Sequence, residues 1–150
     1  MVLKQVENFT YLGWVFHATG ACEEDVKARI SAACEKWCEL LGVLCDQRMP
    51  IAVKGKVYNT MVRPVMIYGA EAWTLRSEEG LLERTEMRML RQMLGITLKD
   101  RKRNDDICHA SGVSCITDKI RESILRWYGH LRWYGHVHLR WYGHVRLTRR

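Results

Sequence analysis

The most regular pattern of apolar and polar residues lies between residues 23 and 46. Apolar side chains recur there in steps of three and four residues, at Val26, Ile30, Ala33, Trp37, Leu40, Leu41 and Leu44. This spacing places them on one side of a helix, so the pattern predicts an amphipathic helix over residues 23–46. Three acidic residues, Glu23, Glu24 and Asp25, fill its first turn, where the helix dipole favours negative charge.

Two prolines punctuate the next segment. Pro50 is typical of a helix start and predicts a second helix from there to about Val62. Pro64 lacks a backbone donor and disfavours helical geometry at Arg63, so the apolar run ending at Tyr68 is either a kinked continuation or a new helix.

A further helix is expected from Ser77 to about Leu94, where Gly95 ends it. Its periodicity separates a basic stripe from an apolar stripe. The basic stripe contains Arg84, Arg88 and Arg91, and the apolar stripe contains Leu82, Met89 and Met93.

After this helix, residues 99–104 form a charged connector, and a last helix is expected to begin near Thr117 and Asp118. The apolar side of that helix contains Ile120, Ile124, Trp127 and Leu131. Because this stripe and that of residues 23–46 are the longest apolar faces of the chain, we expect Trp37 and Trp127 to be buried.

The two ends of the chain differ from this helical pattern. Residues 9–16 are rich in aromatic and branched side chains, which favour a short strand or hairpin arm whose partner is missing. At the other end, the hexapeptide Leu-Arg-Trp-Tyr-Gly-His occurs at residues 125–130, 131–136 and 139–144. The copies match strand alternation better than helix spacing, so the last helix is predicted only to about His130.

The fold class expected from these patterns is mainly α: a small helical bundle preceded by a short β segment and followed by an irregular, repeat-bearing basic tail. The corresponding regions are a β segment over residues 1–20, a helical region over 21–131 and a tail over 132–150. Disorder and aggregation stay open for the tail.

Charge is distributed unevenly along the chain. Of its 24 basic and 17 acidic residues, residues 1–120 carry 17 and 16, whereas residues 121–150 carry 7 and 1. A basic cluster of this kind suggests a polyanion such as nucleic acid, although a solvated basic tail gives the same charge pattern. The sequence contains no apolar run long enough to span a membrane and no apolar signal core, so we expect an intracellular protein, nuclear or cytoplasmic.

Candidate chemistry is sparse. Asp105 and Asp106 are adjacent carboxylates of the kind that bind magnesium in polymerases, but their setting favours the start of a short helix. Cys34, Cys38 and Cys45 share one helix side, yet no CxxC knuckle is present, and such thiols usually pack. We therefore expect no catalytic site, metal site or cofactor.

Several short motifs occur in an order that resembles a known family. They are Gly42 to Pro50, Lys54 to Pro64, Tyr68 to Trp73, Arg88 to Arg91, Gly95 to Thr97, Asp118 to Glu122 and Leu125 to His130. Together they resemble the carboxy-terminal part of LINE-like non-LTR retrotransposon reverse transcriptases of the RTE type. The resemblance covers roughly residues 7–131, and Phe9 to Gly13 looks like the segment that closes the polymerase palm.

The resemblance implies a thumb-like region that holds template and primer, without the palm that carries the polymerase chemistry. A noncatalytic nucleic-acid-binding remnant is therefore expected, with RNA or DNA primer-template as the partner. The residues expected to contact phosphates are Arg84, Arg88, Arg91, Arg101, Lys102, Arg103 and Arg126. The alternatives are a degraded fragment without selected function, or a protein-interaction module in which Trp37, Trp73 and Met89 fill a surface once covered by the palm.

Overall fold

The computed structural model describes residues 8–11, 14–17, 23–73 and 79–147, with side chains described for 23–71, 73 and 79–133. Near the N-terminus, strand β1 (Asn8–Tyr11) pairs antiparallel with β2 (Trp14–His17), and Phe9 lies opposite Phe16. Of the two forms expected from the sequence, the structure shows the hairpin arm. Each strand pairs along one edge only, and among the described residues no further strand joins this sheet.

The first predicted helix is divided in two. Helix α1 (Glu23–Glu39) is followed by the single turn α2 (Leu41–Leu44), with a break at Leu40. Within α2, Leu44 is buried whereas Leu41 is 37% exposed. A periodic pattern alone does not reveal such a break, because both pieces keep helical spacing.

The segment around Pro64 is a continuous helical rod. It consists of α3 (Ile51–Val57), a π-helical turn η1 (Tyr58–Val62) and α4 (Arg63–Met66). Arg63 keeps helical angles, with φ −59° and ψ −42°, directly before the proline. Of the two alternatives for the segment around Pro64, the structure therefore shows a continuation of the preceding helix. The π-helical turn η1 lies directly before the turn that contains Pro64.

Glycines mark the ends of the remaining helices. Gly69 has φ 79° and precedes the short helix η2 (Ala70–Ala72), and Gly95 with φ 66° follows α5 (Glu79–Leu94). Helix η3 (Leu98–Asp100) then leads to α6 (Asn104–Ser111), where Gly112 with φ 66° ends that helix before α7 (Ile116–Leu147). Left-handed angles of this kind carry little steric cost for glycine.

These helices enclose one apolar core. Helix α1 packs against α4 and α5, α6 packs against α3 and α5, and the beginning of α7 packs against η2 and α5. The core residues are Val26, Ala33, Trp37, Leu44, Tyr58, Val62, Met66, Ala70, Trp73, Leu82, Met87, Met89, Leu90, Met93, Ile107, Val113, Ile116 and Ile120. The mainly α fold class is thus confirmed.

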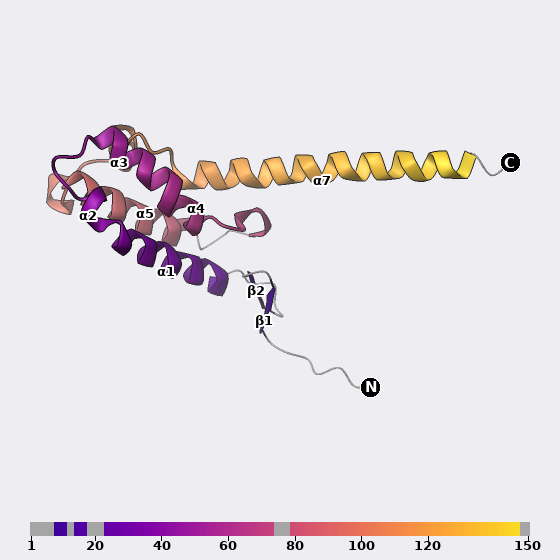
Figure 1. Cartoon of the computed structure of the whole chain (residues 1–150), viewed down its shortest axis with the longest axis horizontal. Helices are drawn as coiled ribbons and strands as arrows, with labels where there is room; N and C mark the ends of the chain where they lie inside the picture. Colours follow the sequence, from indigo (N-terminus) through magenta and orange to yellow (C-terminus); the bar gives the residue numbers. More distant parts are fainter. Residues whose placement is uncertain (1–7, 12–13, 18–22, 74–78, 148–150) are drawn as a thin grey trace.

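Helix α7 extends far beyond this core (Figure 1). We call the helices α1 to α6, with α7 up to Ile124, the body, and residues 125–147 the outer α7. The expected irregular tail is corrected here, because residues 132–147 continue the helix. A helix pairs its backbone groups internally, whereas the strand suggested by the repeat would need a partner.

One burial prediction holds and the other is wrong. Trp37 is 5% exposed and packs edge to face on Tyr58, with ring centroids 6.2 Å apart. Trp127 is 47% exposed, because α7 has left the body by this point.

Candidate nucleic-acid interface

Helix α5 separates its two faces as its sequence predicts. Leu82, Met89 and Met93 are buried in the core, whereas Arg84 and Arg88 are exposed and Arg91 is half-buried. Hydrophobic burial of one stripe therefore fixes the direction in which the arginines point.

The three arginines line one groove of about 840 Å³. The groove is also lined by Ile96 and Leu98, which follow α5, and by Asn104, the first residue of α6. Glu83 is the acidic side chain among the lining residues, so the three guanidinium groups leave the groove with net positive charge. Such a groove attracts phosphate groups.

Short polar contacts hold the groove in shape. Arg91 Nη2 donates to Asn104 Oδ1 at 2.8 Å, and Asn104 Nδ2 donates in turn to Glu83 Oε1 at 3.2 Å. Arg84 Nε donates to the carbonyl oxygen of Gly80 at 2.8 Å. Because a guanidinium has five N–H donors, these contacts leave most donors of Arg84 and Arg91 for a ligand.

The charged connector flanks the groove. A capping box closes η3, in which the backbone and hydroxyl of Thr97 both donate to Asp100, at 2.6 and 2.9 Å, and lower the pKa of that carboxyl. Arg101 follows with φ 48°, and the side chains of Arg101, Lys102 and Arg103 are exposed. These three residues thus lie in sequence between two groove-lining residues, Leu98 and Asn104.

Arg126 lies on a different element. It is exposed on α7, where its Nη2 donates to Glu122 Oε1 at 2.7 Å. Lys119 and Arg126 both lower the pKa of Glu122 through hydrogen bonds and charge. The structure therefore places the connector residues beside the arginines of α5, whereas Arg126, the last of the predicted phosphate contacts, lies on a separate helix.

Sequence reasoning missed a buried polar network. Arg63 Nε and Nη2 donate to Glu86 Oε1 at 3.0 and 2.7 Å, and Tyr58 donates to the same oxygen at 3.0 Å. Burial raises the pKa of Glu86, although Arg63, Tyr58 and the backbone of Ile116 oppose this shift. Burial also raises the pKa of Tyr58 well above its usual value. The available signal was an acidic residue placed within the apolar stripe of α5.

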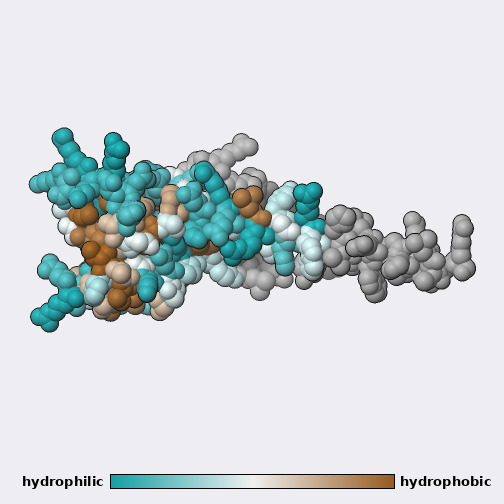
Figure 2. Space-filling view, turned by 90° about the horizontal axis from the view of Figure 1, so that it is seen from above, coloured by the Kyte–Doolittle hydropathy of each residue, from teal (hydrophilic) through white to brown (hydrophobic). Residues whose placement is uncertain are grey.

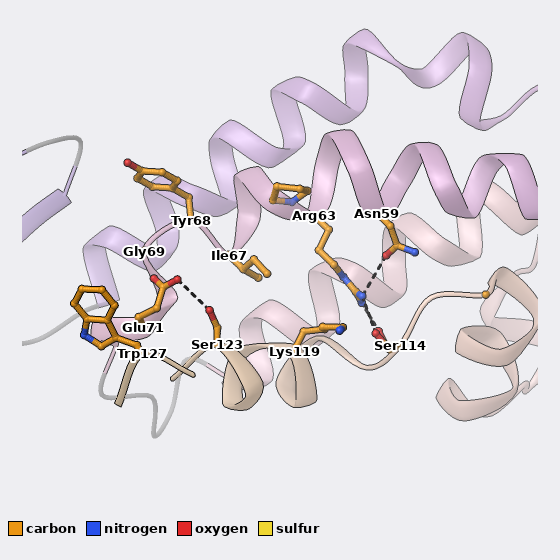
Figure 3. Close-up of a pocket in the computed structure, with 12 residues that line it drawn as sticks. Asn59, Arg63, Ile67, Tyr68, Gly69, Glu71, Ser114, Lys119, Ser123 and Trp127 are labelled. Atoms are coloured by element: carbon orange, nitrogen blue, oxygen red, sulfur yellow. Dashed lines mark hydrogen bonds between the residues drawn. The ribbon is translucent and has the colours of Figure 1, made fainter. Parts of the chain in front are cut away.

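A second hollow, of about 800 Å³, lies between α4, η2 and α7 (Figure 3). Its walls include the aromatic residues Tyr68 and Trp127, and its polar residues include Glu71, Lys119 and Ser123. The sequence pattern assigned Trp127 to the core and gave no indication of this hollow.

The remaining candidate groups are the adjacent aspartates and the cysteines. Asp105 and Asp106 are exposed in the first turn of α6, as their helix-start interpretation predicts. Among the described residues, His, Cys, Asp and Glu form no group of three or more that could hold a metal ion. Burial, followed by the charge of Glu86, raises the pKa of the Cys108 thiol to about 11.

Trp37, Trp73 and Met89 do not line an exposed surface, because all three are 5% exposed. The proposed interaction surface built on them is therefore corrected. Trp73 instead donates from Nε1 to Asp25 Oδ2 at 2.8 Å, which ties η2 to the first turn of α1. The helices of the chain itself cover these three side chains.

No helix within the described parts of the chain combines the length and apolar character that crossing a membrane requires. Comparison with known proteins finds an uncharacterised transposon-derived protein of Caenorhabditis elegans that is 28% identical over 138 residues. The match covers 86% of this chain and 48% of the relative, so the chain spans about half the length of that protein. No known protein family matches the sequence. No solved structure matches it either.

Proposed function

We propose that the chain is a noncatalytic nucleic-acid-binding module derived from the reverse transcriptase of a LINE-like non-LTR retrotransposon. The similarity to a transposon-derived protein supports the origin, and the order of motifs shared with such reverse transcriptases supports the narrower assignment. The proposed ligand is an RNA or DNA primer-template.

The observation that carries the proposal is the groove of α5. Arg84, Arg88 and Arg91 project from one side of a helix whose other side is anchored in the core. Arginine donates several hydrogen bonds to phosphate, and each phosphate that is neutralised releases condensed counterions. The exposed connector residues Arg101, Lys102 and Arg103 extend this positive surface.

Helical protein interaction is the second candidate, and apolar surface favours it. Figure 2 shows hydrophobic residues gathered at the end of the molecule away from the outer α7. Helices α2 and α3, which lie at that end in Figure 1, expose Leu41, Val43, Ile51 and Val53 by 37–46%. Surface of this kind is common at protein interfaces.

The decisive experiment measures binding of the full chain to a labelled primer-template over a range of salt concentrations. Replacement of Arg84, Arg88 and Arg91 by glutamine should weaken binding and reduce the salt dependence by roughly 0.7–0.9 in log–log slope for each phosphate that the variant no longer neutralises. The matched control replaces three exposed cations elsewhere on the body, Lys27, Arg48 and Lys56, by glutamine and changes net charge equally.

The proposal predicts that the control variant binds almost as the unmodified chain does. Equal reductions in affinity in both variants would show that binding depends on net charge alone and would contradict a role for the groove. Circular dichroism and the unfolding midpoint would establish that both variants keep the fold.

A further inference from the structure

The second hollow combines exposed aromatic rings with a few polar groups. Figure 3 shows Tyr68 and Trp127 toward one end of it, on opposite sides of Gly69 and Glu71, and Arg63 toward the other end. Tyr68 is 53% exposed and Trp127 is 47% exposed. Large rings left half in water beside a cavity are suited to hold another flat, apolar surface.

One of the rings is positioned by the body. The guanidinium carbon of Arg29, on α1, lies 4.7 Å from the centroid of the Tyr68 ring, which is the geometry of a cation–π contact. Trp127 comes from α7, one turn after Ser123. The hollow therefore joins the body to the beginning of the outer α7.

The carboxylate of Glu71 supplies an oriented acceptor. Ser123 donates from Oγ to Glu71 Oε1 at 3.0 Å, and this contact fixes the carboxylate within the wall. An ionised carboxylate accepts hydrogen bonds and donates none, so it favours a ligand with N–H groups on one edge.

The cations at the hollow differ in availability. Arg63 uses all five of its donors, because beyond the bonds to Glu86 it donates to Asn59, to the Ser114 hydroxyl and to the Ser114 carbonyl oxygen. Lys119 is about half exposed, pairs with Glu122 at 2.7 Å and can still offer two N–H donors. Lys119 is therefore the cation that can meet an anionic group of a ligand.

These features match one nucleotide of a single strand. We propose that the hollow binds an unpaired guanine, which stacks on Trp127 and donates from its N1–H and N2–H groups to Glu71, while Lys119 meets the adjoining phosphate. Guanine is the base that places two adjacent donors on its Watson–Crick edge, which suits a carboxylate. The inference rests on the proposed nucleic-acid binding and specifies a second contact for it.

The position of the hollow supports this ligand. A third hollow, partly formed by α6, shares Glu83, Met87 and Asn104 with the arginine groove, and shares Gly112 and Ser114 with the hollow beside Trp127. The third hollow therefore lies between the other two, which share no lining residue. A strand whose phosphates lie along α5 would cross this third hollow to reach Trp127.

A cationic side chain of a protein partner is the competing occupant, because a ring beside a carboxylate also attracts cations. Lys119 lines the same hollow and still offers donors beyond its pair with Glu122, so it suits the phosphate of a nucleotide and opposes a second cation. The oligolysine peptide in the test below decides between the two occupants.

The test uses the full chain and a fluorescent 12-nucleotide strand of uridines with one central guanosine. Trp127→Ala should weaken its binding about tenfold, the size of effect that removal of one stacking partner produces. Trp133→Ala is the matched control, because Trp133 lies on the same helix, is 62% exposed and is not a wall residue of the hollow. This variant should keep the preference for guanosine over uridine at the central position.

Inosine, which lacks the N2 amino group, tests the contact to Glu71. A strand with inosine in place of guanosine should bind the unmodified chain several-fold more weakly. The same replacement should change the affinity of the Glu71→Gln variant little. An equal effect in both proteins would overturn the assignment of Glu71, and equal affinities of Trp127→Ala and Trp133→Ala would overturn the stacking site.

The outcome separates this inference from the proposed function. Glutamine at Arg84, Arg88 and Arg91 should lower affinity for every strand and leave the ratio between guanosine and inosine strands unchanged. If those variants weaken binding while Trp127→Ala does not, the groove stands and the guanine site fails. Trp127-dependent binding of an oligolysine peptide, with no preference for guanosine, would also overturn the inference.

Discussion

The body and the beginning of the outer α7 both carry an apolar stripe at helical spacing, yet the body buries its stripe whereas residues 125–133 expose theirs. Trp37 and Trp127 each lie on such a stripe, and their exposed fractions are 5% and 47%. The difference comes from their neighbours. Helix α1 meets α4, α5 and η1, whereas α7 leaves η2 and α5 after its first turns.

Periodicity therefore reports which side of a helix is apolar, and a separate condition decides whether that side is buried. Another element must lie opposite it, and where none does the same side chains form surface. In this chain that surface begins at the hollow beside Trp127, so the region where the core pattern fails is also a candidate binding region.

The largest expected difference between the two regions concerns their ion pairs. Glu86→Ala leaves the buried guanidinium of Arg63 without its carboxylate, and this should lower the free energy of unfolding by about 3–5 kcal/mol. The exposed pair of Arg126 and Glu122 on α7 serves as the control, and Glu122→Ala should leave the denaturant midpoint unchanged. Urea unfolding followed by circular dichroism measures both.

The tryptophans give the second comparison. Trp37→Ala should cost about 3–5 kcal/mol of unfolding free energy, because it opens a cavity beside Tyr58 in the core. Trp127→Ala should cost less than about 1 kcal/mol, because half of the side chain is already in water. Similar costs in the two variants would show that the outer α7 is covered in solution and would break the contrast.

Two glycines give the smallest and sharpest comparison. A methyl group at Gly55 would collide with the backbone carbonyl oxygen of Ser111, so Gly55→Ala should destabilise the body by about 1–3 kcal/mol. Gly129 lies on α7, where an added Cβ would meet open space beside the helix's own backbone. Gly129→Ala should therefore stabilise the helix by about 0.5–1 kcal/mol, visible as increased helical signal on thermal melting.

Much of the fold follows from the sequence, because local signals specify it. The acidic first turn of α1, the apolar stripe of α5 and the glycine after that helix all mark elements where the structure has them. The break at Leu40 and the burial state of Trp127 could not be predicted, because both depend on what packs against the helix.

The candidate site divides in the same way. The arginine stripe of α5 follows from helical spacing alone, and the structure places it on one groove. The network of Arg63 and Glu86 joins residues 23 positions apart, and the hollow brings Tyr68 to Trp127 across 59 positions. A single sequence holds no local signal for contacts over such separations.

The saturated hydrogen bonding of Arg63 has a consequence for the hollow that it lines. Folding alone immobilises this wall, because each N–H of the guanidinium already has a partner in Glu86, Asn59 or Ser114. A ligand that enters the hollow therefore meets a preorganised surface there and loses little side-chain entropy in ordering it. The conformational cost of binding then falls mainly on the ligand and on the mouth of the hollow, where Tyr68 and Trp127 stand partly in water.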